Sequence, residues 1–418
     1  MEGHAGDREV EAGRVRAIDE PPVMLILHVH DRWSARGGAE QHLLSVLDSF
    51  PKGFRSAGLF GWSDGSVLAG HEPPAGLFFI KKLGHKAPFA AETRVGEQLR
   101  DFIKKLKPGL IHVHNILNPH LLQVIAESGP AVMTVYDHRF FCPGRGKVKA
   151  DGSLCRQVFG LGCAECFKEE KYFVRLLALV RARLETVKKF TALIVAGRYM
   201  KQELTLAGVD ETRIHIIPPF VHGLDQGQEP AGLGREVLFA GRIVWAKGIF
   251  DLLEALTQVD GHVRLVVAGA GTRDEAVAAR VKELKLDKRI DFQGWAAHQD
   301  MARLYRRARL LVLPSRWQEP FGLAGLEAQT LARPVLAYDV GGVREWLQDG
   351  RTGIIVPPGN TLALASGINV LMREPGQASA LGRAGRDLAM ERFNPARIMT
   401  LLTSLYQRVG FRPGPSNE

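Results

Sequence analysis

Short apolar runs alternate with longer stretches of helical periodicity along most of this chain of 418 residues. Short, fully apolar runs are typical of strands buried on both faces of a parallel sheet, and the helical stretches between them suit crossover connections. In the second half of the chain this pattern predicts six strands of a doubly wound domain. Their expected ranges are 237–240, 263–268, 290–293, 310–313, 334–338 and 353–356.

The first half shows the same alternation and predicts an N-terminal Rossmann-like domain over residues 21–222. Its expected strands lie near 24–29, 109–114, 132–136 and 192–195. A cluster of Gly, Gln and Pro marks residues 223–234 as a linker, so the C-terminal domain would occupy 235–394 and a last helix 395–412. The first twenty residues are polar and charged, which predicts a disordered arm over 1–20. The expected fold class is α/β, with two doubly wound domains facing a cleft.

The composition is that of an ordinary globular protein, with 45% hydrophobic and 24% charged residues. No apolar run is long enough to span a bilayer and no secretory signal is recognisable, so we expect a cytoplasmic protein. The net charge of +10 is compatible with nucleic acid, an anionic membrane surface or phosphate binding. No nucleic-acid module is recognisable, and we expect no nucleic-acid partner.

Residues 168–189 combine an apolar stripe at helical spacing with many basic side chains. The stripe consists of Phe173, Leu176, Leu177, Val180 and Leu184, and the basic residues are Lys171, Arg175, Arg181, Arg183, Lys188 and Lys189. Such a helix either lies on an anionic membrane surface or packs its stripe on the first domain. We favour packing, and keep peripheral attachment to the inner face of the membrane as the alternative.

Two glutamates with seven residues between them follow one of the predicted strands. The apolar run 308–314 leads into a loop that contains Glu319, and Glu327 lies on the helix that this loop opens. Both carboxylates should face a ligand cleft, because ligands bind at the carboxyl ends of strands in open α/β sheets. Backbone N–H groups at the start of that helix should point there as well and favour anions. They belong to Phe321, Gly322 and Leu323. The combination suits a ligand with both hydroxyls and phosphates.

Two basic residues lie at the first strand–helix junction of the second half. Arg242 follows the strand and Lys247 precedes the helix. Arginine offers a fork of donors to phosphate oxygens and lysine a compact charge, so the pair would hold a diphosphate and stabilise it as it leaves. Two solvated surface charges are the alternative. Since no Asp-x-Asp pair is placed like a metal clamp, we expect no catalytic divalent metal.

Taken in order, these segments resemble the retaining glycosyltransferases of family 4, which have the two-domain glycosyltransferase B-type fold. The resembling segments are GGAEQHLL at 37–44, FAGRIVWAKG at 239–248, EPFGLAGLE at 319–327 and DVGGVREWLQDGRTGIIVPPGN at 339–360. Together they span about residues 22–410. The resemblance implies a nucleotide-diphosphate sugar as donor, bound by the C-terminal domain, and a sugar or lipid-linked saccharide as acceptor, bound by the N-terminal domain. It also implies that the last helix crosses back to the N-terminal domain, and that the protein serves cell-surface polysaccharide assembly.

The resemblance assigns expected roles to individual residues. Glu327 would accept hydrogen bonds from the ribose and Glu319 from the donor sugar, and neither would be a covalent nucleophile. The leaving diphosphate would help to deprotonate the acceptor hydroxyl on the same face of the sugar, which retains its configuration. The rest of the expected donor site consists of Gly37, Gly38, Gly269 and Trp295, the last near the base.

The acceptor side departs from the family pattern. Tyr136 stands where many members have a histidine, Asp137 follows it, and His138 comes two places later than that histidine would. From the loop, His138 could reach the acceptor while Asp137 orients the sugar or the loop, and both are candidate catalytic residues. His112 and His114 end a neighbouring strand on a shared face, where they are either structural or directed to the cleft.

All four cysteines fall within the Gly-rich loop 142–166, as Cys142, Cys155, Cys163 and Cys166. Disulfides are disfavoured in a cytosol. A structural zinc ion with four thiolate ligands would organise a loop that otherwise lacks a core, and it would leave no open position for chemistry. Free thiols, a disulfide or an iron–sulfur cluster are the alternatives.

Two other functions fit the same motifs. One is a sugar-nucleotide epimerase of the same fold, and the other is a non-catalytic sugar-nucleotide sensor or scaffold. The displaced histidine favours the scaffold, whereas Arg242 and Lys247 together with the paired glutamates favour transfer.

Overall fold

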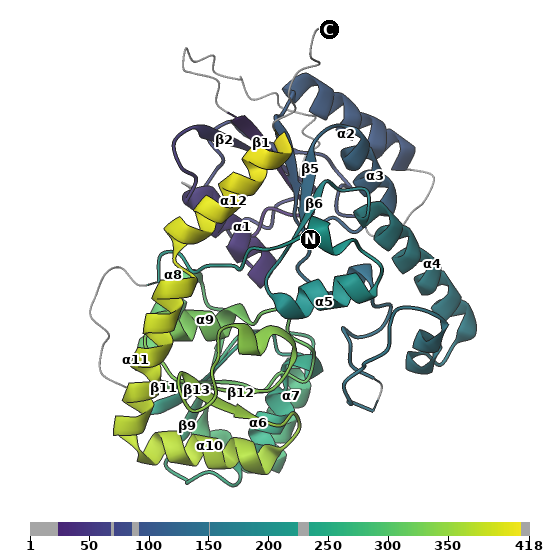
Figure 1. Cartoon of the computed structure of the whole chain (residues 1–418). Coiled ribbons are helices and arrows are strands. Elements are labelled where there is room, and N and C mark those ends of the chain that lie inside the picture. Colours follow the sequence, from purple (N-terminus) through teal and green to yellow (C-terminus); the bar gives the residue numbers. More distant parts are fainter. Residues whose placement is uncertain (1–23, 68–70, 86–91, 150, 225–233, 411–418) are drawn as a thin grey trace, which may run out of the picture.

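The computed structural model describes residues 24–67, 71–85, 92–149, 151–224 and 234–410, and it forms two α/β domains stacked one above the other (Figure 1). The expected arm at 1–20 and most of the expected linker lie outside the described residues. No helix in the described part of the chain has the length and apolar character needed to cross a membrane.

A seven-stranded parallel sheet forms the N-terminal domain, in the order β3-β2-β1-β4-β5-β6-β7. Its strands are β1 Met24–His30, β2 Phe54–Phe60, β3 Leu77–Phe79, β4 Leu110–Val113, β5 Ala131–Thr134, β6 Ala192–Val195 and β7 Ile214–Ile216. Its helices are α1 Gly38–Asp48, α2 Glu92–Leu106, α3 Pro119–Glu127, α4 Glu170–Val187 and α5 Arg198–Leu206, with short 3-10 turns at η1 His138–Phe140, η2 Leu161–Cys166 and η3 Glu211–Arg213.

A six-stranded parallel sheet forms the C-terminal domain, in the order β10-β9-β8-β11-β12-β13. Its strands are β8 Glu236–Ala240, β9 Arg264–Ala268, β10 Ile290–Gly294, β11 Ala308–Leu313, β12 Val335–Tyr338 and β13 Gly353–Val356. Its helices are α6 Ile249–Leu256, α7 Asp274–Glu283, α8 His298–Arg307, α9 Leu323–Thr330, α10 Thr361–Arg373 and α11 Pro375–Arg392, with turns at η4 Trp245–Lys247, η5 Asp287–Arg289 and η6 Gly341–Glu345. The prediction of two doubly wound α/β domains is confirmed.

The last helix, α12 Pro395–Gly410, follows α11 but packs on the other domain (Figure 1). Its apolar face joins residues of β1, β4, β5 and β6 in one buried cluster. Tyr406 is fully buried in that cluster, and its hydroxyl lies 2.6 Å from Nδ1 of His112 on β4. The chain therefore passes between the domains twice, once before β8 and once through α12.

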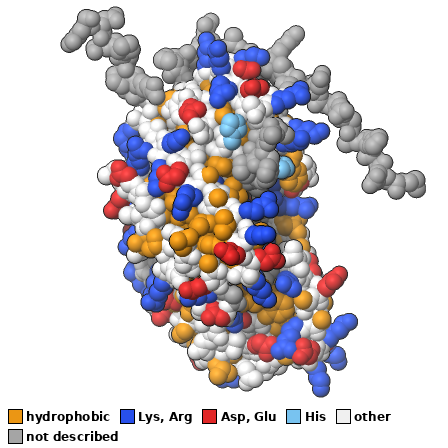
Figure 2. Space-filling view, turned by 90° about the vertical axis from the view of Figure 1, so that its right-hand side faces the viewer, with side chains coloured by type: hydrophobic (Ala, Val, Ile, Leu, Met, Phe, Trp, Pro, Cys, Tyr) orange, Lys and Arg blue, Asp and Glu red, His pale blue; other side chains and the backbone are white. Residues whose placement is uncertain are grey.

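The amphipathic stretch forms α4, and its apolar stripe faces the protein. Phe173, Leu177, Val180 and Leu184 are buried, and the helix packs against α3. Arg183 corrects the expected cationic face, because it is buried and its Nε donates to the carbonyl of Leu117 at 2.6 Å. On the face of the molecule seen in Figure 2, basic side chains are scattered among acidic ones around a central apolar patch.

Candidate functional site

The carboxyl ends of two adjacent strands bring the donor-side residues together. β8 and β11 are hydrogen-bonded neighbours, so η4 after β8 meets the loop after β11. There Nζ of Lys247 lies 2.5 Å from Oε1 of Glu319, and the hydroxyl of Ser315 donates to the same oxygen. Burial alone would raise the pKa of Glu319, but the ammonium of Lys247 outweighs it and lowers this pKa below its usual value. The buried carboxylate is therefore an anion and a hydrogen-bond acceptor.

The loop that carries Glu319 is fixed by contacts with η6. The N–H of Gly342 donates to the carbonyl of Glu319 at 2.7 Å, and that of Gly341 donates to the side chain of Gln318 at 2.6 Å. Gly341 has φ +51°, and a Cβ there would lie 2.2 Å from the Glu319 carbonyl oxygen. Only glycine allows this approach, so the backbone position of Glu319 is tightly specified.

Glu327 lies one turn into α9, which begins after Gly322 in the left-handed conformation (φ +93°). Its carboxylate is half-buried, and Tyr305 donates to it at 2.7 Å. The carbonyl of Phe321 accepts from the indole of Trp346 at 2.6 Å, which holds the start of the helix in place. The segment Phe321–Leu323 thus leads from the loop of Glu319 into the first residue of α9.

The other expected donor residues surround this centre. Arg242 is exposed after β8, and Gly269 (φ +148°) packs so closely on the next loop that a Cβ would lie 1.9 Å from the carbonyl oxygen of Gly241. Trp295 is exposed and lies under the guanidinium of Arg36, 4.7 Å from the ring centroid. Because Arg36 directly precedes the Gly37-Gly38 loop, this contact joins the N-terminal glycine loop to the C-terminal domain.

Gly37 itself has φ +138°, and a Cβ there would come within 2.3 Å of the carboxylate of Glu40. Around a Cβ at Gly38 there is open space. The backbone conformation and close packing at position 37 therefore require glycine, whereas the absence of a side chain at Gly38 leaves open space beside the backbone.

On the N-terminal side, His138 begins the turn η1 after β5 and reaches the C-terminal domain. Its ring is 1% exposed and lies 5.7 Å from the ring of Trp317, which is two residues before Glu319. Nε2 lies 2.8 Å from the hydroxyl of Tyr199, and Nδ1 is buried with no partner among the described residues. Burial lowers the pKa of His138 to about 4, so its imidazole is neutral at neutral pH.

The carboxylate of Asp137 is paired with Arg139, two residues later in the chain. It accepts from the backbone N–H of Arg139 at 2.9 Å and from the Arg139 side chain at 2.6–2.9 Å. Burial raises the pKa of Asp137, and the guanidinium of Arg139 more than compensates, so its pKa is lowered. These contacts give Asp137 a role in shaping the turn that positions His138.

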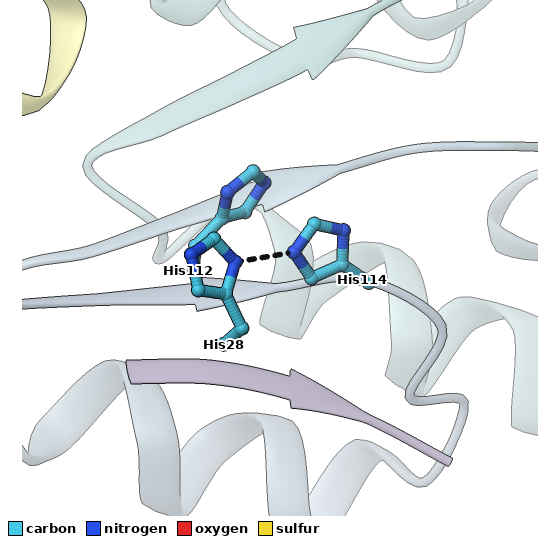
Figure 3. A group of neighbouring side chains, drawn as sticks. All are labelled: His28, His112 and His114. Carbon is cyan, nitrogen blue, oxygen red and sulfur yellow. Dashed lines mark hydrogen bonds between the residues drawn. The ribbon is translucent and has the colours of Figure 1, made fainter. Parts of the chain in front are cut away.

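His112 and His114 lie in a buried network with His28 of β1 (Figure 3). Nδ1 of His28 lies 2.9 Å from Nε2 of His114, and His112 contacts Thr134 and Tyr406 at 2.7 and 2.6 Å. Burial lowers the pKa of all three imidazoles. Of the two interpretations left open for His112 and His114, the structure supports the structural one.

The four cysteines line one small cavity of about 20 Å³, roughly the space of a single water molecule. The backbone N–H of Lys147 points at Sγ of Cys142 at 3.5 Å. Burial and the neighbouring thiols raise the pKa of Cys163 and of Cys166. Loop residues 143–154 continue from this cavity to the C-terminal domain, where Gly152 packs beside Trp245 and Arg316.

Two residues of this region were not identified from the sequence. Arg316 forms an ion pair with the buried Asp251 at 2.7 Å, which fixes the start of the Glu319 loop. Trp317 has Nζ of Lys247 5.2 Å from its ring centroid and His138 against its edge. The sequence does show that Trp317 stands two residues before Glu319, and this proximity could have marked Trp317 as a site residue.

Comparisons with known proteins concern the family and the fold. A family model described as glycosyl transferases group 1 matches residues 226–388. Glycogen synthase of Mycobacterium tuberculosis is 26% identical over 312 residues, which cover 72% of this chain and 69% of that protein. Alpha-maltose-1-phosphate synthase of Mycolicibacterium smegmatis is 30% identical over 253 residues, covering 53% and 64%.

Among solved structures, Anabaena HepE in complex with UDP-glucose matches with a TM-score of 0.70 and 19% identity, over 92% of this chain and all of that one. Sucrose-phosphate synthase of Thermosynechococcus elongatus matches with a TM-score of 0.68 and 21% identity, over 92% and 98%. At these identities the structural likeness concerns the fold. The chain thus has the fold of these glycosyltransferases, the B-type fold, and its C-terminal domain is similar to the group 1 glycosyl transferases.

Proposed function

We propose that this protein is a retaining glycosyltransferase that moves a sugar from a nucleotide-diphosphate sugar to an acceptor hydroxyl. The observation that carries the proposal is the buried pair of Lys247 and Glu319, on the same loop–helix segment as Glu327 and facing His138 from the other domain. A cation, two carboxylates and a helix N-terminus on one side of a cleft suit a ligand with phosphates and hydroxyls.

In this proposal Lys247 contacts the diphosphate and stabilises the charge that develops as it leaves. Glu319 holds the ammonium in place through one carboxylate oxygen, and the exposed Arg242 closes on the diphosphate from the surface. Preorganised cations of this kind act where charge develops in the transition state. Because they supply the positive charge that a metal would otherwise provide, we propose transfer without a catalytic divalent metal.

Retention of configuration follows from the same assignments. Glu319 is an anion already paired with Lys247, so it is suited to accept from a sugar hydroxyl rather than to form a covalent bond. The leaving diphosphate then takes the proton of the acceptor hydroxyl, which attacks from the same face. The neutral imidazole of His138 lies on the acceptor side, where its buried Nδ1 suits one hydrogen bond to the acceptor or the transferred sugar.

For the acceptor we propose a sugar or a lipid-linked saccharide, in cell-surface polysaccharide assembly at the cytoplasmic face of a membrane. The support is the family resemblance and the net charge of +10, which favours an anionic membrane surface. The apolar stripe of α4 is buried, so attachment would use exposed side chains. Sedimentation of the protein with vesicles that contain or lack anionic lipid tests this attachment. Equal binding to the two kinds of vesicle would count against an anionic membrane surface.

We propose that the four cysteines hold a structural zinc ion, which would have to draw their sulfurs closer together, because the described residues that bring three ligand atoms within 4.8 Å of one another do not include these cysteines. They line one cavity, and the backbone N–H of Lys147 points at Sγ of Cys142. Zinc would displace the thiol protons and join Cys142 and Cys155 to Cys163 and Cys166 across the loop. Metal analysis of the purified protein should give one zinc per chain, and Cys155→Ser should lower that content. A metal-free protein of unchanged thermal stability would contradict the assignment.

The first experiment is thermal unfolding with UDP, GDP, CDP and ADP in parallel. A nucleotide at about one hundred times its dissociation constant should add about 2.7 kcal/mol to the stability. Glu327→Gln should abolish the response while leaving the unliganded midpoint unchanged, because Glu327 is half-buried at the helix surface. If no nucleotide stabilises the protein, the donor assignment fails and a non-enzymatic scaffold becomes the better description.

Turnover then tests the finer statements. With the stabilising nucleotide, candidate sugar donors are assayed with saccharide acceptors, with and without added Mg²⁺. We expect a product with the anomeric configuration of the donor and a rate independent of Mg²⁺. Inversion, or a requirement for the metal, would refute the corresponding part of the proposal. Conversion of the donor without an acceptor would indicate an epimerase.

A further inference from the structure

The indole of Trp317 is held on several sides at the centre of the candidate site. The ammonium of Lys247 lies over its face, 5.2 Å from the ring centroid, and His138 meets it edge-on at 5.7 Å. On a third side is Gly146 (φ +69°), where a Cβ would lie 2.7 Å from Cε3 of the indole. Contacts from both domains therefore fix the direction of the indole N–H.

That N–H is a buried donor with no acceptor among the described residues. An interaction with this N–H helps to lower the pKa of the Glu319 carboxylate beside it, although the two groups do not reach full hydrogen-bond geometry. Buried donors are nearly always paired in native proteins, so an unpaired one beside the candidate donor-site carboxylate needs an explanation.

The carboxylate beside it is also only partly used. Lys247 and Ser315 both donate to Oε1 of Glu319. Oε2 is therefore the oxygen suited to a ligand. A fixed N–H donor next to a carboxylate acceptor matches one chemical group in particular, a hydroxyl, which can accept through its oxygen and donate its hydrogen at once.

We propose that Trp317 is a specificity-determining residue: its indole N–H donates to one hydroxyl of the transferred sugar, and that hydroxyl donates to Oε2 of Glu319. The inference rests on the proposed function, because it requires the donor sugar to lie beside Glu319. Trp317 would thus select a sugar that has a hydroxyl at this position over one that lacks it. A site built to bond a hydroxyl discriminates against the deoxy sugar because its buried polar groups are left unpaired.

The test compares Trp317→Phe with wild type in calorimetric binding of UDP, UDP-glucose and the four monodeoxy analogues of UDP-glucose. Phenylalanine keeps an aromatic face for Lys247 and His138 and removes the N–H. Trp62→Phe is the matched control, since Trp62 is half-exposed in the loop after β2, and it should behave as wild type.

For wild type we expect one deoxy analogue to bind clearly more weakly than the rest. Trp317→Phe should bind UDP-glucose about two- to tenfold more weakly, which is the range of one hydrogen bond, and UDP as tightly as wild type. In Trp317→Phe the loss of affinity for that one analogue, relative to UDP-glucose, should be at least about twofold smaller than in wild type. The reason is that one of the two groups that bind the hydroxyl, the indole N–H, is already absent. A purely structural role of the ring would weaken all ligands alike.

The inference is overturned if Trp317→Phe weakens UDP and every sugar nucleotide equally, or changes none of them. It falls together with the proposed function if the wild-type protein binds neither UDP nor UDP-glucose and none of GDP, CDP and ADP stabilises it. Binding of both with no hydroxyl-dependent difference refutes the inference alone.

A second measurement does not depend on the variant's folding. In wild-type protein the Trp317 indole N–H resonance should shift on adding UDP-glucose and stay in place with UDP. A resonance that responds equally to both ligands would contradict a bond to the sugar.

Discussion

Replacing Lys247 by methionine tests the electrostatic core of the site. The change keeps the length of the side chain and removes its charge, leaving the Glu319 carboxylate, which is 3% exposed, with Ser315 as its remaining donor. Removing one partner of a buried ion pair costs about 3–5 kcal/mol. Since the Lys247 side chain is 18% exposed, we expect the lower end of this range, about 3 kcal/mol.

The pH dependence of this loss of stability shows whether the unpaired carboxylate of Glu319 causes it. In wild type the pKa of Glu319 is lowered, so its contribution to stability is complete above the unfolded value of 4.5 and is lost as the pH falls through the folded value. Without Lys247, burial raises this pKa above 4.5. The destabilisation of Lys247→Met relative to wild type should therefore be largest at neutral pH, and should decrease as the pH falls through the raised value.

The assay is urea unfolding of Lys247→Met and wild type at about pH 7.5 and about pH 5. Adding Glu319→Gln to the variant should restore part of the lost stability, because no buried charge then remains. Equal unfolding free energies for variant and wild type at both pH values would refute the reasoning, since they would mean that the carboxylate is solvated.

Two further predictions concern packing and the buried histidines. Gly325→Ala should destabilise by more than about 1–3 kcal/mol in urea, because the new Cβ would lie 2.0 Å from the ring of Trp346, whereas Gly376→Ala has open space and should be neutral or slightly stabilising. Equal effects at the two glycines would contradict this. Burial lowers the pKa of His28 to about 3 and of His138 to about 4, below the unfolded 6.5. The unfolding free energy should fall as the pH drops from about 6.5 to about 4, by about 3 kcal/mol for each, and a flat profile would refute it.

The strands that could be predicted from the sequence are mainly those whose residues form an uninterrupted apolar run. All six strands of the C-terminal domain were predicted, and all except β10 (sequence IDFQG) are short, mainly apolar runs between helices. In the N-terminal domain β2, β3 and β7 were missed. The two outer strands, β3 and β7, have only three residues each and are partly exposed, so their apolar runs are weak. The first two residues of β2, Phe54 and Arg55, are only half-buried, which interrupts its pattern.

Site residues could be predicted where their position depends only on following a strand of the parallel sheet. Lys247 and Glu319 are 72 residues apart, and both follow strands whose carboxyl ends share an edge of the sheet. Their direct pairing depends on which strands are neighbours, and a sequence does not state strand order. The position of His138 depends on a 3-10 turn whose direction no periodicity encodes, and Trp317 gains its meaning from the side chains of another domain.

The crossing of α12 has a consequence for how the chain can be divided. The sixteen residues of this helix are the last that the structure describes, yet their apolar face completes the hydrophobic core under β1, β4, β5 and β6. A fragment that ends before residue 395 would contain the whole N-terminal sheet and still expose that core to water. A fragment that begins at β8 would carry the same helix with nothing to cover it. Neither half is self-sufficient, so the first domain can be completed only after synthesis of the second is finished.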